Sequence, residues 1–468
     1  MTQLSNAVYK RQTAVVERIV QFGTGNFLRA FVDCLVDDLN KSQSLDLGVV
    51  IVQSTNGQTA QTINEQEGLY TVVTQGLKND KEINDAQVIE CVTRSIALQS
   101  EYEAYLALAA SPNLQIIVSN TTEAGIHYVN IPYDQQPSTN FVANLTHFLY
   151  RRYEAFNGDQ TRGLTILPCE LIEANGDELK ATIIQYAKAW HLQEAFIEWL
   201  HVANTFCNTL VDRIVPGYPK DQIEDLTARL GYEDELVVIA EPYYIWVIEA
   251  TESLRNVLPF KADIHNVLLV DSLQLYRERK VKVLNGAHTA LTPMALLLNV
   301  ETVSEALAHP VIGEFVENYI VQEVLPTIDA DEASLEQYKN DVIERFKNPF
   351  IKHYVKSIAL NTIAKYKTRN VPALLEYAQE TGELPFRAVT ALAAWIYLYK
   401  NDRLFTPTDE AATIKILRSQ DVQSILQNES LWGADLTAIE GLVSFVEQAM
   451  QAFEKLQAKE WIAALEVK

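Results

Sequence analysis

Three polar residues that could carry acid/base chemistry lie close together in the second half of the chain. They are Lys280, Asn285 and His288, spaced K-x4-N-x2-H within RERKVKVLNGAHTALTP, residues 277–293. In an α-helix the three side chains would spread over about 140° of the circumference, so one surface could present them all. A lysine with a pKa lowered by desolvation can be a base, an asparagine amide can donate to an oxyanion, and a histidine can hydrogen-bond a hydroxyl. Such a set suits hydride transfer between a secondary alcohol and a nicotinamide.

A second interpretation of this stretch is a basic surface helix with an Asn-Gly turn and an incidental histidine. It is the weaker one, because VKVLNGAHTAL (281–291) is otherwise apolar or small. We therefore expect Asn285 and His288 to be buried and to need partners.

A glycine turn near the N-terminus predicts a nucleotide site. In IVQFGTGNFLRAF (19–31) an apolar strand precedes Gly23 and Gly25, and a helical pattern follows. The first glycine allows the tight turn, and the second lets the backbone approach a pyrophosphate at the helix N-terminus. The third glycine of the fingerprint is replaced by Leu28, so an ordinary strand-to-helix turn stays an alternative. The predicted cofactor-binding residues are Phe22, Gly23, Thr24, Gly25, Asn26 and Phe27.

The end of the second predicted strand does not identify the dinucleotide. It reads Gln53-Ser54-Thr55-Asn56, with no acidic residue to hold an adenosine ribose and no cation to hold a 2′-phosphate. On these residues alone, NAD and NADP both stay open.

Three further stretches are candidates for a substrate site. PCELIEANGDELK ends a predicted strand and contains Asn175, although a helix N-cap would also explain it. Asp212 and Arg213 lie inside an apolar run, where an internal salt bridge is the commoner explanation. The cationic stretch 348–372 could hold a substrate carboxylate or be a solvated helix face. Its cations are Lys352, Lys356, Lys365, Lys367 and Arg369.

Strands that alternate with helices must position these residues. Short runs rich in β-branched residues, separated by amphipathic segments, predict a parallel sheet covered on both faces. The predicted strands are 16–22, 48–54, 114–120 and 163–169, and the predicted helices are 27–41 and 139–156. Residues 70–98 are interpreted as a hairpin insertion with a polar turn at Lys78–Lys81.

After about residue 270 helical periodicity dominates. It is clearest in 303–328, 335–346 and 441–465, with Pro372 and Pro385 at helix starts. The predicted fold class is therefore α/β, with a Rossmann-like dinucleotide-binding domain at 1–270. A mostly α-helical substrate domain follows at 271–468.

Composition limits the partners and the compartment. Lys and Arg total 38 against 61 Asp and Glu, and the net charge of −23 repels nucleic acid and anionic lipid. The four cysteines are widely spaced with no CxxC pair, so we expect no disulfide framework, no metal centre and a cytoplasmic location. The apolar run 388–399 is too short to span a bilayer and is expected to be a buried helix.

In their order along the chain, these motifs resemble the mannitol dehydrogenase family of metal-independent, long-chain polyol dehydrogenases. The motifs are Gly23-Thr24-Gly25-Asn26-Phe27 with Arg29-Ala30, Thr122-Glu123, Asn175-Gly176, Val211-Asp212-Arg213-Ile214 and Lys280, Asn285 and His288. Within the family, GNFLRAFVD, PCELIEANGD and ERKVKVLNGAHTAL most resemble the tagaturonate reductases, which interconvert D-tagaturonate and D-altronate. The resemblance covers essentially the whole chain.

The resemblance implies NAD as cofactor, a small sugar-acid substrate and a role for each site residue. Lys280 would be the general acid/base, while Asn285 and Asn175 would polarise the carbonyl. The residues implied to contact the substrate are Asp212, His288 and Lys365.

Two departures from the polyol enzymes affect the substrate pocket. Cys169 is followed by Glu170-Leu171 instead of an aspartate–asparagine pair, and Ser357 stands where those enzymes have an arginine. Both changes fit a different substrate end, such as a carboxylate. The alternatives are a fructuronate reductase, a mannitol-type polyol dehydrogenase or a non-catalytic sugar-acid sensor. An intact Lys280 argues against the sensor, which would be free to lose it.

Overall fold

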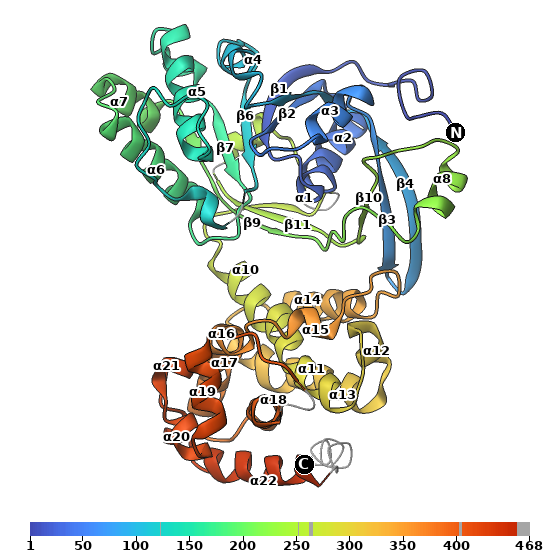
Figure 1. Cartoon of the computed structure of the whole chain (residues 1–468), viewed down its shortest axis with the longest axis vertical. Coiled ribbons are helices and arrows are strands. Elements are labelled where there is room, and N and C mark those ends of the chain that lie inside the picture. The colour runs from blue at the N-terminus through green and yellow to red at the C-terminus, as the bar shows by residue number, and fades with distance from the viewer. Residues whose placement is uncertain (122, 251, 262–264, 402–404, 456–468) are drawn as a thin grey trace. The chain divides into compact units, whose positions relative to one another are not determined.

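The computed structural model describes residues 1–468 except 122, 251, 262–264, 402–404 and 456–468. The chain divides into two compact units (Figure 1). The first unit comprises residues 1–75 and 83–273. The second comprises the hairpin tip 76–82 and the chain from Gln274 onward.

A six-stranded parallel sheet forms the centre of the first unit, in the order β5-β2-β1-β6-β7-β8. Its strands are β1 (Val16–Phe22), β2 (Leu47–Gln53), β5 (Val92–Ala97), β6 (Ile116–Ser119), β7 (Thr165–Pro168) and β8 (Thr205–Phe206). Val49 and Ile51 of β2 belong to one buried cluster. Val50 and Val52 point to the opposite face and belong to another. Burial on both faces explains why these strands are continuously apolar.

Helices cover both faces of this sheet (Figure 1). They are α1 (Asn26–Arg29), α2 (Val32–Gln43), α3 (Thr59–Glu65), α4 (Tyr102–Leu108), α5 (Phe141–Ala155), α6 (Asn175–Ala189) and α7 (Glu194–Val202). Helix α8 (Ile223–Leu230) packs instead on Val73 and Ile239, outside the main sheet. Apolar residues of α2 and α3 pack in the cluster that contains Ile51. Those of α4, α5, α6 and α7 pack in the cluster that contains Val50. The predicted α/β, Rossmann-like fold class is confirmed.

The sequence did not predict two short sheets that flank the main one. One has the order β10-β3-β4 and the other β12-β11-β9. Their strands are β3 (Tyr70–Lys78), β4 (Lys81–Ile89), β9 (Asn208–Asp212), β10 (Val238–Ala240), β11 (Ile245–Glu249) and β12 (Val267–Val270). The segment predicted as one hairpin at 70–98 therefore holds three strands. The third, β5, pairs with β2 in the main sheet.

The predicted helix at 27–41 is wrong in one respect, because it is two helices. α1 ends at Arg29, and α2 begins at Val32. Phe31 between them leaves the helical conformation (φ −124°, ψ −76°) and packs against Phe27, Tyr244 and Trp246. Aromatic packing at this point interrupts a pattern that reads as one amphipathic helix.

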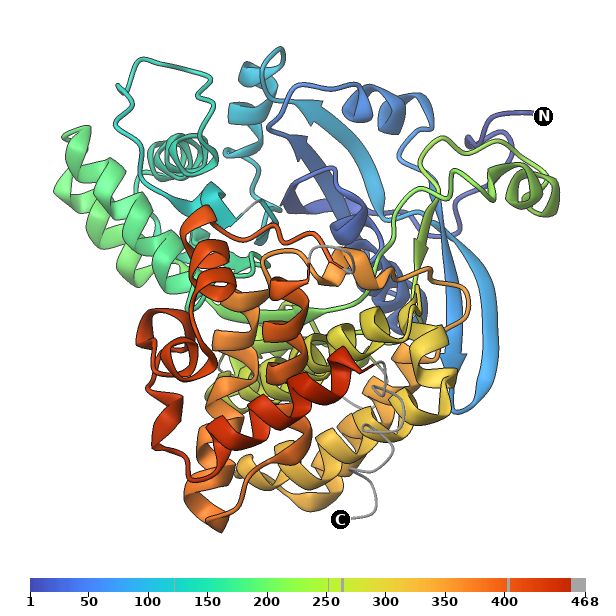
Figure 2. The same ribbon diagram turned by 60° about the horizontal axis from the view of Figure 1, so that its bottom comes forward.

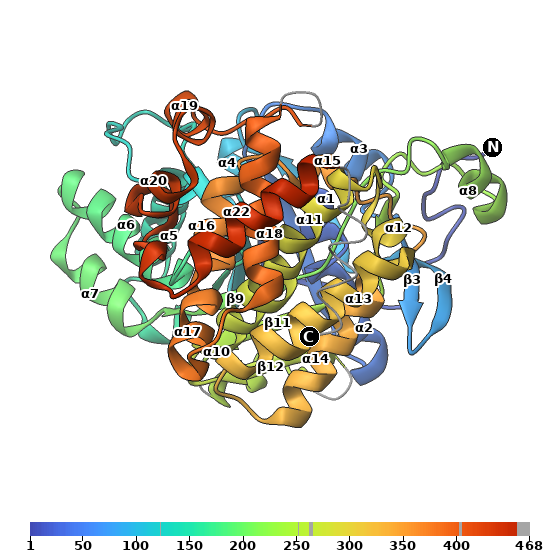
Figure 3. The ribbon, with the colours of Figure 1, turned by 90° about the horizontal axis from the view of Figure 1, so that it is seen from below.

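The second unit is helical, apart from the hairpin tip (Figures 2 and 3). Its α-helices are α10 (Gln274–Arg279), α11 (Gly286–Leu297), α12 (Val303–Ala308), α13 (Pro310–Asn318), α14 (Glu332–Phe346), α15 (Val355–Ile358), α16 (Thr362–Arg369), α17 (Val371–Thr381), α18 (Phe386–Lys400), α19 (Ala411–Ser419), α20 (Val422–Leu426), α21 (Glu429–Trp432) and α22 (Leu442–Glu454). Helices α11 and α18 are the most buried and pack together, and α22 lies across α18. Two π-helical segments, η4 (Lys280–Asn285) and η5 (Tyr319–Val324), complete this unit's main elements.

Helix boundaries in the second unit follow local chemistry. Pro372 lies in the first turn of α17, and Pro385 caps α18, as predicted. The predicted helix 303–328 is instead α12, α13, η5 and a final 3-10 turn, because His309 leaves the helical conformation before Pro310. The predicted 441–465 helix begins as α22, and its part from 456 lies outside the described residues. The run 388–399 lies in the buried helix α18, and within the described ranges no helix is long and apolar enough to cross a membrane.

Candidate active site

The glycine turn joins β1 to α1 with a backbone that only glycine adopts readily at its first position. Gly23 has φ +127°, and a Cβ there would lie 3.2 Å from the Asn120 carbonyl oxygen. Its amide donates to the Val52 carbonyl at 3.1 Å, which fixes the turn against β2. Gly25 precedes α1, and a Cβ built there meets no heavy atom within 4 Å. The open space beside the start of α1 fits a pyrophosphate approaching the backbone.

Arg29, which was not predicted as a site residue, holds this turn in shape. Its guanidinium donates to the Thr24 carbonyl at 3.1 Å, to Oδ1 of Asn26 at 2.7 Å and to the Leu236 carbonyl at 2.5 Å. Only 5% of the residue is exposed, and the guanidinium lies over the Tyr70 ring. The sequence signal for this role was an arginine among the apolar residues of NFLRAF (26–31), because a buried charge needs hydrogen-bond partners.

Gln53 organises the loop after β2, where a Rossmann-like domain reads the adenosine ribose. Its side-chain amide donates to the carbonyls of Thr55 and Gly57 at 2.8 and 2.9 Å, and its oxygen accepts from the Ala60 amide at 2.7 Å. Gln53 is 4% exposed, so its side chain holds the loop backbone from the protein interior. The exposed positions of this loop are uncharged.

Lys280 and Asn285 are the first and last residues of a π-helix. The sequence predicted an ordinary helix here, in which the two side chains would diverge by about 140°. A π-helix bonds residue i to residue i+5, so residues five apart lie on the same side in successive turns. The structure therefore brings the predicted acid/base and the predicted carbonyl donor closer together than the sequence analysis expected. Both residues are partly exposed.

His288 lies one turn further on, in α11, and is 8% exposed. Its ring centroid is 4.1 Å from that of Phe346 and 4.9 Å from that of His353. Nε2 is buried and has no hydrogen-bond partner among the described residues, contrary to the expectation that burial would supply one. Burial lowers the pKa of His288 well below its usual value, and the charges of His353, Arg345, Arg369 and Lys365 lower this pKa further. The imidazole is therefore neutral at physiological pH.

Asn370 fastens the end of α16 to the start of α11. Its amide donates to the Gly286 carbonyl at 2.9 Å and to the Tyr319 hydroxyl at 2.8 Å. A Cβ on Gly286 would approach the Tyr319 hydroxyl to 3.3 Å, so glycine suits this close contact. Next to it, Arg369 donates to the Thr289 hydroxyl at 3.3 Å. Arg369 therefore contacts the residue that directly follows His288 in the sequence.

The predicted cations of 348–372 separate into two groups. Lys352 and Lys356 are exposed, and Lys367 donates to the Ser430 carbonyl at 3.1 Å. Lys365 and Arg369 lie near His288. Lys365 donates to the Ile358 carbonyl at 2.9 Å, and burial together with Arg369 lowers its pKa against the opposing effect of Asp409.

Asn175 does not have the free amide that its predicted role requires. Its Nδ2 donates to the carbonyls of Pro168, Glu170 and Thr209 at 3.0, 3.0 and 3.1 Å. Its Oδ1 accepts from the Thr209 amide at 2.8 Å, and 1% of the residue is exposed. The side chain ties β7 to β9 and has no hydrogen left to donate to a substrate carbonyl.

Two other predicted positions also lie at strand ends. Asp212 ends β9, opposite Ile245 of β11, and is 7% exposed. Glu170 accepts from the Thr121 amide at 2.9 Å and from the Ser119 hydroxyl at 3.1 Å, which joins the ends of β6 and β7. Thr122 and the side chain of Glu123 lie outside what the structure describes.

Lys282 has a structural role two residues after Lys280. Its ammonium donates to Glu278 at 2.6 Å, to the Thr327 carbonyl at 3.0 Å and to Glu376. It is 5% exposed. These bonds anchor the π-helix to neighbouring helices.

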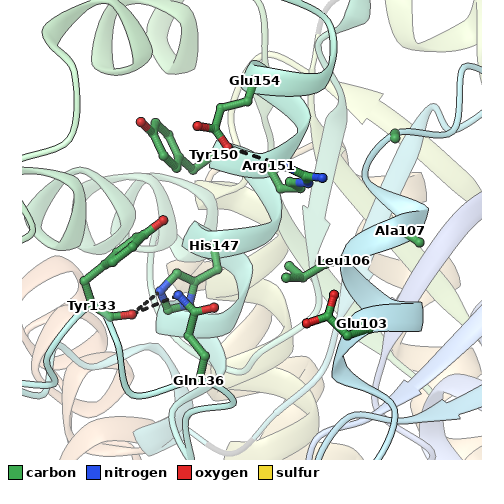
Figure 4. Close-up of a pocket in the computed structure, with 10 residues that line it drawn as sticks. Glu103, Leu106, Ala107, Tyr133, Gln136, His147, Tyr150, Arg151 and Glu154 are labelled. Carbon is green, nitrogen blue, oxygen red and sulfur yellow. Dashed lines mark hydrogen bonds and ion pairs between the residues drawn. The ribbon is translucent and has the colours of Figure 1, made fainter.

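A separate cavity of about 410 Å³ lies beside α4 and α5 in the first unit (Figure 4). Tyr133, Gln136 and His147 line one side of it. His147 stacks on Trp190 at 4.4 Å and shares a 3.0 Å hydrogen bond with the Tyr133 carbonyl, and burial lowers its pKa to about 4. None of the predicted site residues lines this cavity.

Comparison with known proteins identifies the family of this arrangement. A model of the mannitol dehydrogenase Rossmann domain matches residues 17–261, and a model of the mannitol dehydrogenase C-terminal domain matches 272–454. The chain belongs to the mannitol dehydrogenase family. It is therefore an oxidoreductase that acts on a secondary alcohol.

Relatives of this family member are similar over nearly their full lengths. An altronate oxidoreductase of Bacillus subtilis (strain 168) is 45% identical over 457 residues, or 95% of this chain and 94% of the relative. One from Escherichia coli O7:K1 (strain IAI39 / ExPEC) is 41% identical over 467 residues, or 96% and 97%.

Two solved structures share the fold at lower identity. A D-sorbitol dehydrogenase in substrate-free form has a TM-score of 0.81 at 20% identity, covering 98% of this chain and 99% of that one. A Pseudomonas fluorescens mannitol 2-dehydrogenase, in a ternary complex with NAD and D-mannitol, has a TM-score of 0.73 at 21% identity and covers 100% of both chains.

Proposed function

We propose that this protein is an NAD-dependent oxidoreductase that interconverts D-tagaturonate and D-altronate without a metal. Two altronate oxidoreductases that are 45% and 41% identical over nearly the whole chain support this substrate pair. The observation that carries the chemistry is the π-helix that begins at Lys280 and ends at Asn285, followed by the unpartnered Nε2 of His288.

The cofactor is NAD, held by the turn of Phe22, Gly23, Thr24, Gly25, Asn26 and Phe27. The open space at Gly25 receives the pyrophosphate, and the uncharged loop after Gln53 suits a ribose without a 2′-phosphate. When bound, the reduced nicotinamide supplies the hydride that the ketone carbon of tagaturonate accepts.

Each predicted site residue has a proposed task in the reaction. Nζ of Lys280 gives its proton to the carbonyl oxygen during reduction and removes it during oxidation. The amide of Asn285 donates to the same oxygen as negative charge develops there. Nε2 of His288 hydrogen-bonds a neighbouring substrate hydroxyl, which the neutral state of this ring permits. Asn175 becomes a positioning residue, while Asp212 and Lys365 keep the predicted role of substrate contacts.

All four cysteines are buried free thiols, which supports the expected reducing cytoplasmic location.

The test is NADH oxidation across a panel of D-tagaturonate, D-fructuronate and D-fructose. We expect the highest kcat/KM with tagaturonate and formation of altronate in equal amount to the NADH consumed. A preference for fructuronate or fructose would replace the proposal with one of those reductases. Binding of sugar acids without any turnover would favour the sensor.

A further inference from the structure

A buried group of polar side chains adjoins the glycine turn of the first unit. We call it the Asp33 cluster, and its members are Gln21, Arg29, Asp33 and Tyr70. Three of them are fully buried, and Arg29 is 5% exposed. They come from β1, α1, α2 and β3, so only the fold brings them together (Figure 1). Because Arg29 holds the turn in shape, its partners in the cluster act on the same turn.

Hydrogen bonds connect Asp33 to the turn along two routes. The amide of Gln21 donates to Oδ2 of Asp33 at 3.3 Å and to the Gly23 carbonyl at 3.4 Å. The hydroxyl of Tyr70 donates to Oδ2 of Asp33 at 2.6 Å and lies 3.2 Å from the Arg29 carbonyl. The guanidinium of Arg29 lies over the Tyr70 ring, 5.2 Å from its centroid. A change at the Asp33 carboxyl therefore reaches both the first glycine and the arginine that fixes the turn.

The cluster has more acceptors than donors when Asp33 is ionised. Oδ1 of Asp33 and Oε1 of Gln21 are both buried and have no hydrogen-bond partner among the described residues. An ionised carboxylate can only accept hydrogen bonds, whereas a protonated carboxyl also carries one donor. A proton on Oδ1 turns one of the two orphaned acceptors into a donor. Since an unpaired buried acceptor destabilises the fold, the hydrogen bonding of the cluster favours the neutral carboxyl.

The surroundings of this carboxyl make it titrate near neutral pH. Burial raises the pKa of Asp33 to about 7, with a smaller contribution from the charge of Asp37. The hydrogen bonds from Tyr70 and Gln21 and the positive charge of Arg29 act in the opposite direction. The neighbouring cysteines are neutral, because burial raises the pKa of both thiols; they are Cys34 and Cys91. Asp33 is therefore a group at the turn whose charge changes around physiological pH.

We propose that Asp33 is a positioning residue of the cofactor turn and that NADH binding is coupled to the proton on its carboxyl. This inference rests on the proposed cofactor role of the turn. The neutral carboxyl supplies the donor that the cluster lacks. The carboxylate instead adds a buried negative charge beside a turn that must receive a pyrophosphate, and like charges repel. By linkage, tighter NADH binding to the protonated form means that NADH binding raises the proton affinity of Asp33.

The first experiment titrates the full chain with NADH, followed by fluorescence, from pH 6 to pH 9. In the wild type we expect the NADH dissociation constant to rise about five- to tenfold, as for a phosphate brought near a buried carboxylate. The rise should begin near pH 7. Asp33→Asn keeps a donor and an acceptor at this position but has no proton to lose. Its dissociation constant should vary by less than about twofold over the same range.

Two further variants separate the proton of Asp33 from other titrating groups. Tyr70→Phe removes a hydrogen bond that lowers the pKa of Asp33, so the rise of the dissociation constant should move to higher pH. A loss of packing alone would not move it. The matched control is Glu323→Gln in the second unit, because burial raises the pKa of this carboxyl to about 7 as well. This control should leave the pH dependence of NADH binding unchanged.

Calorimetry of NADH binding gives an independent measurement on the wild type. Titrations near pH 7.5 in two buffers with different ionisation enthalpies should show uptake of about 0.3–0.6 proton per NADH. Glu323→Gln should take up the same fraction. In Tyr70→Phe the pH of greatest uptake should rise.

The outcomes distinguish this inference from the proposed function. If wild-type binding is independent of pH, if no proton is taken up, or if Asp33→Asn keeps the wild-type pH dependence, the coupling to Asp33 is refuted while the cofactor role stands. An unmoved pH profile in Tyr70→Phe refutes it also where Asp33→Asn does not fold. If NADH does not bind at any pH, the proposed cofactor role fails, and this inference fails with it.

Discussion

Replacing Asn370 by alanine tests whether the end of α16 positions the π-helical segment. Asn370 is fully buried, and its amide makes two hydrogen bonds, to the Gly286 carbonyl and the Tyr319 hydroxyl. A buried group that loses its partner costs about 1–3 kcal/mol, so the variant loses about 2–6 kcal/mol of stability if neither group finds another partner. Since Gly286 directly follows Asn285, part of this free energy should appear as a misplaced donor at the carbonyl.

We therefore expect Asn370→Ala to lower kcat/KM for the ketone substrate about 10- to 100-fold, equivalent to about 1.4–2.8 kcal/mol of transition-state stabilisation. The NADH dissociation constant, measured by fluorescence, should stay within about twofold, because the cofactor turn belongs to the first unit. Steady-state kinetics are compared at a temperature at which both proteins are folded.

The matched control is Asn144→Ala, which also removes a buried amide. Asn144 donates to the Ser138 carbonyl at 2.8 Å and accepts from the Ser138 amide at 2.9 Å, in the first unit. It should lower the thermal midpoint to a similar extent and leave kcat/KM within about twofold. If Asn370→Ala loses stability but keeps its kcat/KM, the amide is structural alone and the positioning argument is refuted.

Three other variants address the cofactor turn, the acid/base and the buried acid of α2. Gly25→Val should fold, because a Cβ at this position meets no atom within 4 Å. It should raise the NADH dissociation constant at least tenfold by filling the space of the pyrophosphate. An unchanged dissociation constant in a fluorescence titration would show that the glycine turn does not bind the cofactor. Lys280→Ala should lower kcat about 10²–10⁴-fold with NADH still bound and recover some rate with added small amines, whereas near wild-type turnover would assign the proton to another group. Burial raises the pKa of Asp33 from 3.8 to about 7, so the folded protein binds this proton more tightly than the unfolded chain does. The protonated carboxyl therefore contributes about 4 kcal/mol to the free energy of unfolding. This contribution is complete below about pH 4 and is lost as the pH rises through 7. From pH 5 to pH 8 the free energy of unfolding in urea should therefore fall more for the wild type than for Asp33→Asn, which has no titrating group at this position. An equal fall in both proteins would contradict this prediction.

Strands and helices with a strong pattern could be predicted from the sequence. β1, β2, β6 and β7 are short β-branched runs between polar residues, and each is buried on both faces of the sheet. The edge strand β8 has two residues, too few for any periodicity to be visible. β5 has a clear strand pattern, but pairing with β2 instead of β4 depends on contacts between distant residues. The hydrophobic pattern of the sequence identifies a strand, but contacts between distant residues decide which strand it pairs with.

The site was predicted less completely than the fold. The motif from Lys280 to His288 was visible because the three polar side chains predicted to act at the substrate lie within nine residues. The π-helix was not, since one extra residue per turn leaves no mark on an apolar pattern. Arg345 is 57 residues further along the chain and resembles any charged residue in an amphipathic helix. Its neighbour Phe346 packs on the His288 ring, and Arg345 acts electrostatically on this imidazole.

We expect the two units to bind an anion in different ways. At the glycine turn, the guanidinium of Arg29 is committed to Thr24, Asn26 and Leu236, so a pyrophosphate there depends on backbone amides and the start of α1. Around His288 the cations are side chains held by packing. A substrate carboxylate can be recognised only where positive charge is concentrated, and the net charge of −23 makes such places rare on the rest of the surface. If the substrate is a sugar acid, as proposed, we expect Lys365 and Arg369, which lie near His288, to supply this positive charge rather than the exposed Lys352 and Lys356.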